Sequence, residues 1–186
     1  MRVDKLSQKK WVASTVSHLH TVMIVSYVFY IFTHSSCEDS YNFIWFFDDE
    51  CFLKADQRFV YCSLITAAYL SNDFWVVICE IGAQDKLTQQ LLVHHVVAIV
   101  GIIGSVFAGY SYPGMTCLML LVEISNIFLD LKLLMSKDDY DQLPAKICFL
   151  CFLVTYIIFR IILMPIINLM VLKTLKLVFT GLAPFR

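Results

Sequence analysis

Charged residues are scarce in this chain. Asp, Glu, Lys and Arg make up 16% of its 186 residues, and 59% of the residues are hydrophobic. A soluble domain is about a quarter charged, and so small a protein cannot bury this much apolar surface in one core. The mean hydropathy is +0.73. The scarcity of charge excludes a disordered chain, a collagen-like repeat and an ordinary soluble enzyme, and it indicates an integral membrane protein.

Neither sign of charge dominates, because 14 basic residues face 15 acidic ones. No basic run stands beside aromatic residues, which disfavours a nucleic-acid groove. The sequence also has no phosphate-binding loop, no dinucleotide fingerprint and no G-x-S-x-G nucleophile motif. These absences exclude nucleic acid as a partner and leave lipid as the expected one.

The seven cysteines give little evidence of metal or redox chemistry. Most lie in apolar segments, where a thiol behaves as a small hydrophobic group. Cys148 and Cys151 have C-x-x-C spacing but no second pair, so a zinc or redox role is disfavoured. Cys37 and Cys51 share one polar loop and can form a disulfide if that loop faces an oxidising lumen.

Long apolar runs predict an all-α polytopic bundle with about five membrane spans, each needing about 20 residues. The stretch Leu87–Val122 contains no Asp, Glu, Lys or Arg and is too long for one crossing. Gly109, Pro113 and Gly114 mark a turn within it. The expected spans are 11–33, 59–80, 87–108, 114–133 and 147–171.

The distribution of Lys and Arg predicts the orientation. Residues 1–10 carry four basic side chains and are expected in the cytosol, and the loop 34–58 is acidic, as on the far side. We divide the chain into this cytosolic segment 1–10, a transmembrane domain 11–172 and a basic tail 173–186. With five spans the tail falls on the far side, against the rule. The tail is therefore expected to lie in the membrane interface, unless a further helix belongs to the architecture.

Polar and ionisable residues inside spans are costly, so each is a candidate for function. Several share a helical face at i, i+3 or i+4 spacing, and five such helices would enclose polar groups at membrane depth. The alternative is that they only bond neighbouring helices. The candidates are His18, His20, Tyr69, Asp73, Gln90, His94, His95, Glu123, Asn126, Asp130, Tyr156 and Arg160.

The adjacent histidines His94 and His95 carry the most specific signal. Imidazole can act as a general base, as an acyl-carrying nucleophile or as a metal ligand. The repeated histidine boxes of membrane di-iron enzymes are absent, so we expect no metal. Arg160 keeps its charge and needs a counter-ion, for which Glu123, Asp73 or Asp130 are the candidates. Asp130 and Lys132 can alternatively sit at the interface.

Five segments, in order, resemble the TLC-domain proteins, the membrane family that includes the ceramide synthases, the TRAM proteins and small lipid-regulating members. The double histidine His94-His95 has its counterpart in the family. The arginine of the last segment is closer to its phenylalanine than in the family pattern. The segments are Trp11 with Ser17–Thr21, Tyr69–Asp73, His94–His95, Leu121–Ser125 with Asn126 and Asp130, and Phe159–Arg160 with Pro165.

The resemblance implies a barrel of helices around a lipid-sized cavity. In ceramide synthases the double histidine joins an acyl group from acyl-CoA to a sphingoid amine. Carried over, catalytic roles fall to His94, His95, Asp73 and Glu123, and cavity roles to His20, Tyr69, Gln90, Asn126 and Arg160. The His-Asp pair of the ceramide synthases is missing here, which places the chain nearer the small members. The family usually has six helices, and we expect five, so the last one can be lacking.

We therefore expect an integral membrane protein that binds a lipid or acyl chain and acts in lipid homeostasis, with acyl transfer from acyl-CoA as the candidate reaction and no other cofactor. The rival hypothesis is a non-catalytic subunit of a larger membrane complex, whose partner proteins cover the open side of the bundle. The organelle is left open between the endoplasmic reticulum, another internal membrane and, for a complex subunit, the mitochondrial inner membrane. A transporter or channel is less favoured, because no internal repeat is visible.

Overall fold

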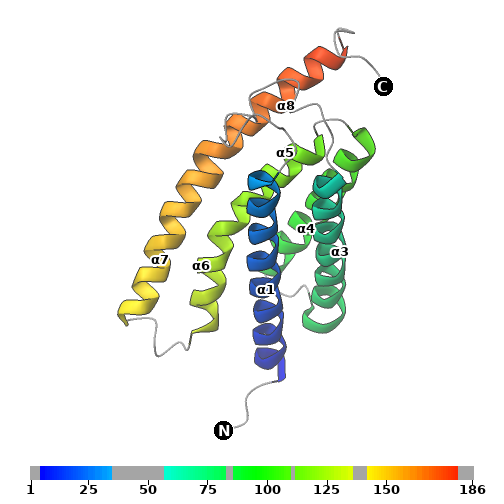
Figure 1. Cartoon of the computed structure of the whole chain (residues 1–186). Helices are drawn as coiled ribbons and strands as arrows, with labels where there is room; N and C mark the ends of the chain where they lie inside the picture. Colours follow the sequence, from blue (N-terminus) through cyan, green and yellow to red (C-terminus); the bar gives the residue numbers. More distant parts are fainter. Residues whose placement is uncertain (1–4, 35–56, 83–85, 110–111, 136–141, 180–186) are drawn as a thin grey trace.

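The computed structural model describes residues 5–34, 57–82, 86–109, 112–135 and 142–179. These residues are helical apart from short turns, and no strand occurs among them. The predicted all-α bundle is therefore confirmed (Figure 1). The expected pairing of Cys37 with Cys51 lies outside the described residues.

The first three expected spans are helices with nearly the predicted ends. Helix α1 covers Lys5–Thr33, α3 covers Gln57–Val76 and continues as the π-helical turn η2, Val77–Ile81, and α4 covers Lys86–Ala108. Helix α1 begins six residues before the expected span, because its first turns extend beyond the apolar run.

The last two expected spans are each built from three consecutive helical pieces. Helix α5 covers Tyr112–Met119, the 3₁₀ turn η3 covers Leu120–Val122 and α6 covers Glu123–Leu134. Helix α7 covers Leu143–Tyr156, the π-helical turn η5 covers Ile157–Leu163 and α8 covers Met164–Phe179. Helix α8 thus continues past the expected end at 171 into the predicted tail, and Lys176 lies on it.

Among the described residues, four segments are long and apolar enough to cross a membrane: Trp11–Thr33, Gln57–Glu80, Thr88–Ala108 and Leu143–Leu172. The remaining expected span, α5 to α6, is interrupted by η3 and carries three charged residues. It is also the most buried segment of the bundle, with α5 almost fully enclosed. Length and composition support its neighbours as spans, and packing places α5–η3–α6 between them.

The predicted turn between the third and fourth spans is present. Helix α4 ends at Ala108, and Gly109 follows with φ +67°. This left-handed conformation is open to glycine without strain, so Gly109 stops the helix. Pro113 lies in the first turn of α5, where its missing N–H is not needed.

Two polar contacts fix which helix ends lie together. The Lys9 side chain binds Glu80, which joins the start of α1 to the end of η2. At the opposite end, Arg58 Nη1 donates a hydrogen bond to the His34 carbonyl at 2.8 Å. Helices α1 and α3 are therefore antiparallel, as expected for consecutive spans.

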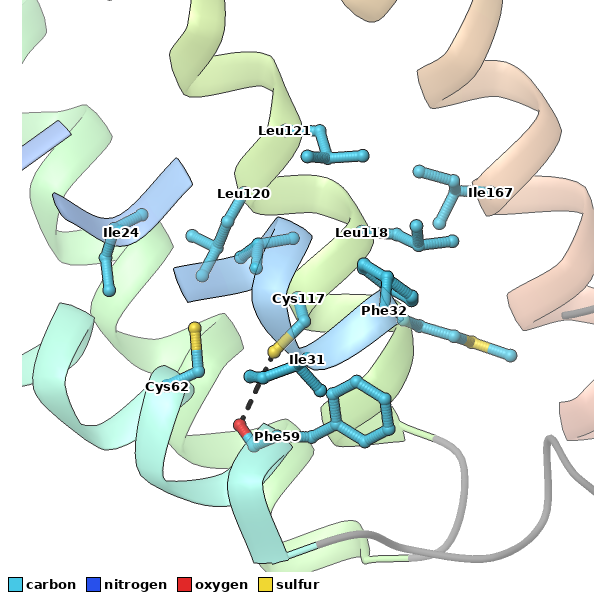
Figure 2. Packing of buried hydrophobic residues seen from close by; sticks show 12 residues of the cluster. Ile24, Ile31, Phe32, Phe59, Cys62, Cys117, Leu118, Leu120, Leu121 and Ile167 are labelled. Carbon is cyan, nitrogen blue, oxygen red and sulfur yellow. Dashed lines mark hydrogen bonds between the residues drawn. The ribbon is translucent and has the colours of Figure 1, made fainter. Parts of the chain in front are cut away.

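Apolar packing holds together the end of the bundle that contains His34 and Arg58. Helix α1 packs against α6 and α3, α3 against α4 and α5, and α6 against α7. Figure 2 shows this core, in which the Cys117 thiol points to the Phe59 carbonyl at 3.5 Å. Its members include Ile24, Val28, Ile31, Phe32, Phe59, Cys62, Met115, Cys117, Leu118, Leu120, Leu121 and Ile167.

The interior is divided along the helix axes. On α1 the inward residues Ile24, Val28 and Ile31 belong to the apolar core, and one or two turns earlier the helix presents His20 and Ser17. Helix α3 runs antiparallel to α1, so its first residues, including Phe59 and Cys62, belong to the apolar core. Its polar residues Tyr69 and Asp73 follow later in the helix. Ser17, His20, Tyr69 and Asp73 therefore lie in the half of the bundle nearer Lys9 and Glu80.

Candidate functional site

A histidine–carboxylate contact joins α4 to α3. His95 Nε2 lies 3.2 Å from Asp73 Oδ2, and the two side chains are 5% and 16% exposed. If Nε2 carries the proton toward the carboxylate, Nδ1 keeps its lone pair, and this nitrogen is buried without a protein partner. A neutral imidazole held in this way presents a base at Nδ1.

Helix α1 meets α3 through stacked rings. The centroids of His20 and Tyr69 are 3.7 Å apart, with their planes inclined by 12°. Ser17, three residues before His20, lies near the Tyr69 hydroxyl. One turn of α1 therefore stacks on the ring of Tyr69 and lies close to its hydroxyl.

Asp130 on α6 is the most enclosed carboxylate of the described chain. It is 8% exposed, Ser17 lies near it, and its Oδ2 atom is buried without a hydrogen-bond partner among the described residues. Asp130 is therefore covered by protein rather than open to its surroundings. Helices α1 and α6 pack closely on each other, which brings Ser17 near Asp130.

A second chain of hydrogen bonds connects α6 to η5. Asn126 Nδ2 donates to Glu123 Oε2 at 2.6 Å, and Arg160 Nη2 donates to Asn126 Oδ1 at 3.1 Å. The Arg160 guanidinium also lies 5.4 Å from the centre of the Tyr156 ring. The expected direct pairing of Arg160 with an acid is absent from the described residues, because the Asn126 amide stands between Arg160 and Glu123.

These contacts form one group around Tyr69. The carboxylates of Asp73, Asp130 and Glu123 are all near enough to interact electrostatically with its hydroxyl. We call this group the polar cluster. Its members come from all five expected spans: Ser17 and His20, Tyr69 and Asp73, His95, Glu123, Asn126 and Asp130, and Arg160.

Two predicted site residues lie elsewhere. Gln90 and His94 share one face of α4, and both are exposed. The His94 and His95 ring centroids are 6.0 Å apart, and the rings point to different sides of the helix. The structure thus brings together His20, Tyr69, Asp73, His95, Glu123, Asn126 and Arg160, and separates Gln90 and His94 from them.

Sequence reasoning missed Ser17 as a site residue. A lone serine in an apolar helix gives no signal, because most serines there bond their own backbone. The helical register did contain the information: Ser17, Thr21, Ile24 and Val28 recur at i, i+4, i+7 and i+11, and the last three are buried. Following that stripe back by one turn places Ser17 on the inward face.

The polar cluster can bind and move protons, and it presents both signs of charge. His95 offers a base, Arg160 offers a fixed cation, and three carboxylates offer acceptors. No set of three metal-ligating side chains is assembled in the parts of the chain that the structure describes. The chemistry open to these residues is acid–base chemistry and the recognition of a polar group.

Comparison with known proteins gives a family. The chain matches the TLC domain over residues 10–182. It is similar to TLC domain-containing protein 1 of Homo sapiens, with 33% identity over 100 residues, which is 52% of this chain and 38% of that protein. The mouse and rat proteins of the same name are each 35% identical over 100 residues, again covering 38% of their length.

The matched region is thus well under half the length of these relatives. No solved structure is significantly similar to the chain. The family match nevertheless covers nearly the whole sequence and all five expected spans. The chain belongs to the TLC-domain family of membrane proteins.

Proposed function

We propose that this protein binds a lipid or acyl chain in its helical bundle and acts in membrane lipid homeostasis, with the polar cluster holding the lipid's polar group. The observation that carries the proposal is the buried His95–Asp73 pair, because an acid and an imidazole at membrane depth are costly to maintain without a task. The other expected spans contribute the remaining side chains of the polar cluster.

The reaction that this pair suits is acyl transfer. His95 Nδ1 takes the proton from the hydroxyl or amine of an acceptor lipid as that nucleophile attacks the thioester carbonyl of acyl-CoA. The C–S bond breaks, the new ester or amide forms, and the proton passes from His95 to the departing thiolate. The products are the acylated lipid and free CoA. Asp73 orients the imidazole, and we assign contact with the acyl donor to His94, which is exposed on α4.

The test follows labelled acyl groups in membranes that contain the protein. Radiolabelled oleoyl-CoA is added, and the lipid products are compared for wild type, His95→Ala, Asp73→Asn and His94→Ala. Loss of a general base typically lowers a rate by about 10²–10⁴-fold, which we expect for His95→Ala. His34→Ala, an exposed histidine outside the polar cluster, is the matched control. An unchanged product with inserted His95→Ala protein rejects acyl transfer by this residue.

The rival proposal is a non-catalytic subunit of a larger membrane complex. The observation that favours it is the exposed pair Gln90 and His94 on α4, since polar side chains on an uncovered helix face suit a partner helix. Purification in mild detergent separates the two proposals. A fixed stoichiometry with partner proteins and mixed lipids supports the subunit, and a lone protein with one enriched lipid class supports lipid binding.

A further inference from the structure

Arg160 is held in an unusual way for a cation inside a membrane span. In the described part of the chain its contacts are the Asn126 carbonyl oxygen at 3.1 Å and the face of Tyr156 at 5.4 Å. Its Nε atom is buried without a partner. No described carboxylate pairs with it, although Glu123 lies one helical turn from Asn126.

The role of Asn126 explains this arrangement. Glu123 accepts a hydrogen bond from the Asn126 amide nitrogen, and this orients the amide oxygen toward Arg160. The guanidinium is therefore fixed by a neutral oxygen, and its charge is not cancelled by direct contact with a carboxylate. A fixed guanidinium with free N–H donors is suited to a planar or branched anion.

The backbone at Arg160 supports the same reading. Arg160 lies in the π-helical turn η5, which interrupts the helix between α7 and α8. Such turns are costly and frequently occur at functional sites. Arg160 itself is half-buried, so part of its side chain can meet a ligand.

We propose that Arg160 binds the anionic group of the protein's lipid ligand, a carboxylate or a phosphate, and that Asn126 and Tyr156 position the guanidinium for it. This inference rests on the proposed lipid binding and gives the class of ligand. The shared chemistry is an oxyanion attached to acyl chains. A free fatty acid and a phosphatidate are the two sources.

The experiment uses three lipids with the same oleoyl chains and different heads: oleic acid, dioleoyl phosphatidate and neutral dioleoylglycerol. Each is added to the purified full chain in detergent, and bound lipid is counted by native mass spectrometry. We expect wild type to retain one or both anionic lipids at least about tenfold better than dioleoylglycerol, as for hydrogen bonds to a charged group. Retention of oleic acid alone identifies a carboxylate as the ligand group. Retention of phosphatidate alone identifies a phosphate.

Two variants test the residue itself. Arg160→Met removes the charge, and Asn126→Asp places a carboxylate beside an intact Arg160. Because the new carboxylate and Glu123 share at most one proton at this distance, one negative charge remains to neutralise the guanidinium. In both variants the ratio of retained anionic lipid to retained dioleoylglycerol should fall by about tenfold. Asn168→Asp, which adds the same charge at an exposed position of α8, should keep it.

The outcomes distinguish this inference from the proposed function. Equal binding of all three lipids, or an unchanged preference in folded Arg160→Met and Asn126→Asp, overturns the role of Arg160 and leaves lipid binding intact. Failure of wild type to retain any of the three lipids overturns the proposed lipid binding as well.

Discussion

At the scale of single residues, hydropathy and helical spacing located most of the polar cluster. Asp73, His95, Glu123 and Asn126 stand out because they interrupt apolar runs. Which of two adjacent histidines faces inward depends on the rotation of α4, and this is set by its packing on α3. The burial of Asp130 could not be decided from the sequence, because it depends on which helices pack beside α6.

Tyr69 connects α1 to the acids, and its ring and hydroxyl can be separated by mutation. Tyr69→Phe keeps the ring stacked on His20 and removes the hydroxyl near Ser17, so we expect a loss of about 0.5–1.5 kcal/mol in the free energy of unfolding. Tyr69→Ala also removes the ring and should cost a further about 1–3 kcal/mol, less than for a fully buried aromatic. Thermal unfolding in detergent measures both, and equal losses for the two variants would show that the ring contributes nothing.

At the scale of helices, the ends of the spans were predictable because apolar runs, Gly109 and Pro113 are local signals. The interruptions η2, η3 and η5 were not, since no Gly or Pro lies within any of these three turns. The length of the last helix was also underestimated. Its residues beyond 171 include lysines, and helix formation there does not require an apolar sequence.

Two adjacent isoleucines of α8 give a direct test of which helix face is buried. Ile167 is 0% exposed in the apolar core, and Ile166 is 43% exposed. Ile167→Ala should destabilise the protein by about 2–5 kcal/mol, because it leaves a cavity between α8 and α5. Ile166→Ala removes the same atoms from an outward face and should cost under about 1 kcal/mol. Similar unfolding midpoints for the two variants in detergent would place α8 in a different rotation.

At the scale of the whole molecule, sequence predicted the alternation of spans and the family, and it could not give the neighbours of each helix. Helix α1 packs most extensively on α6, which is remote in sequence. That contact is what brings Ser17 to Asp130. Such pairings depend on how well whole helix faces fit together, and the sequence of one apolar span does not identify the helix that packs against it.

The alternating topology predicts where introduced thiols can be reached. Gln57 and Lys86 are both exposed and lie at opposite ends of the bundle. In a background without native cysteines, Lys86→Cys should react with a membrane-impermeant maleimide from the cytosolic side, and Gln57→Cys from the far side. Labelling of both from one side of intact vesicles would reject the arrangement of the first three spans.

The helix that carries Arg160 is longer than a membrane is thick. From Leu143 to Phe179 it has 37 consecutive helical residues, including the π-helical turn η5, and it extends beyond the other helices in Figure 1. At 1.5 Å per residue it measures about 55 Å, whereas the hydrocarbon layer is about 30 Å thick. It must therefore tilt, emerge or bend, and η5 with Pro165 is the place where its backbone yields most easily. Hydrophobic mismatch in a thicker or thinner bilayer thus acts directly on the turn that positions Arg160.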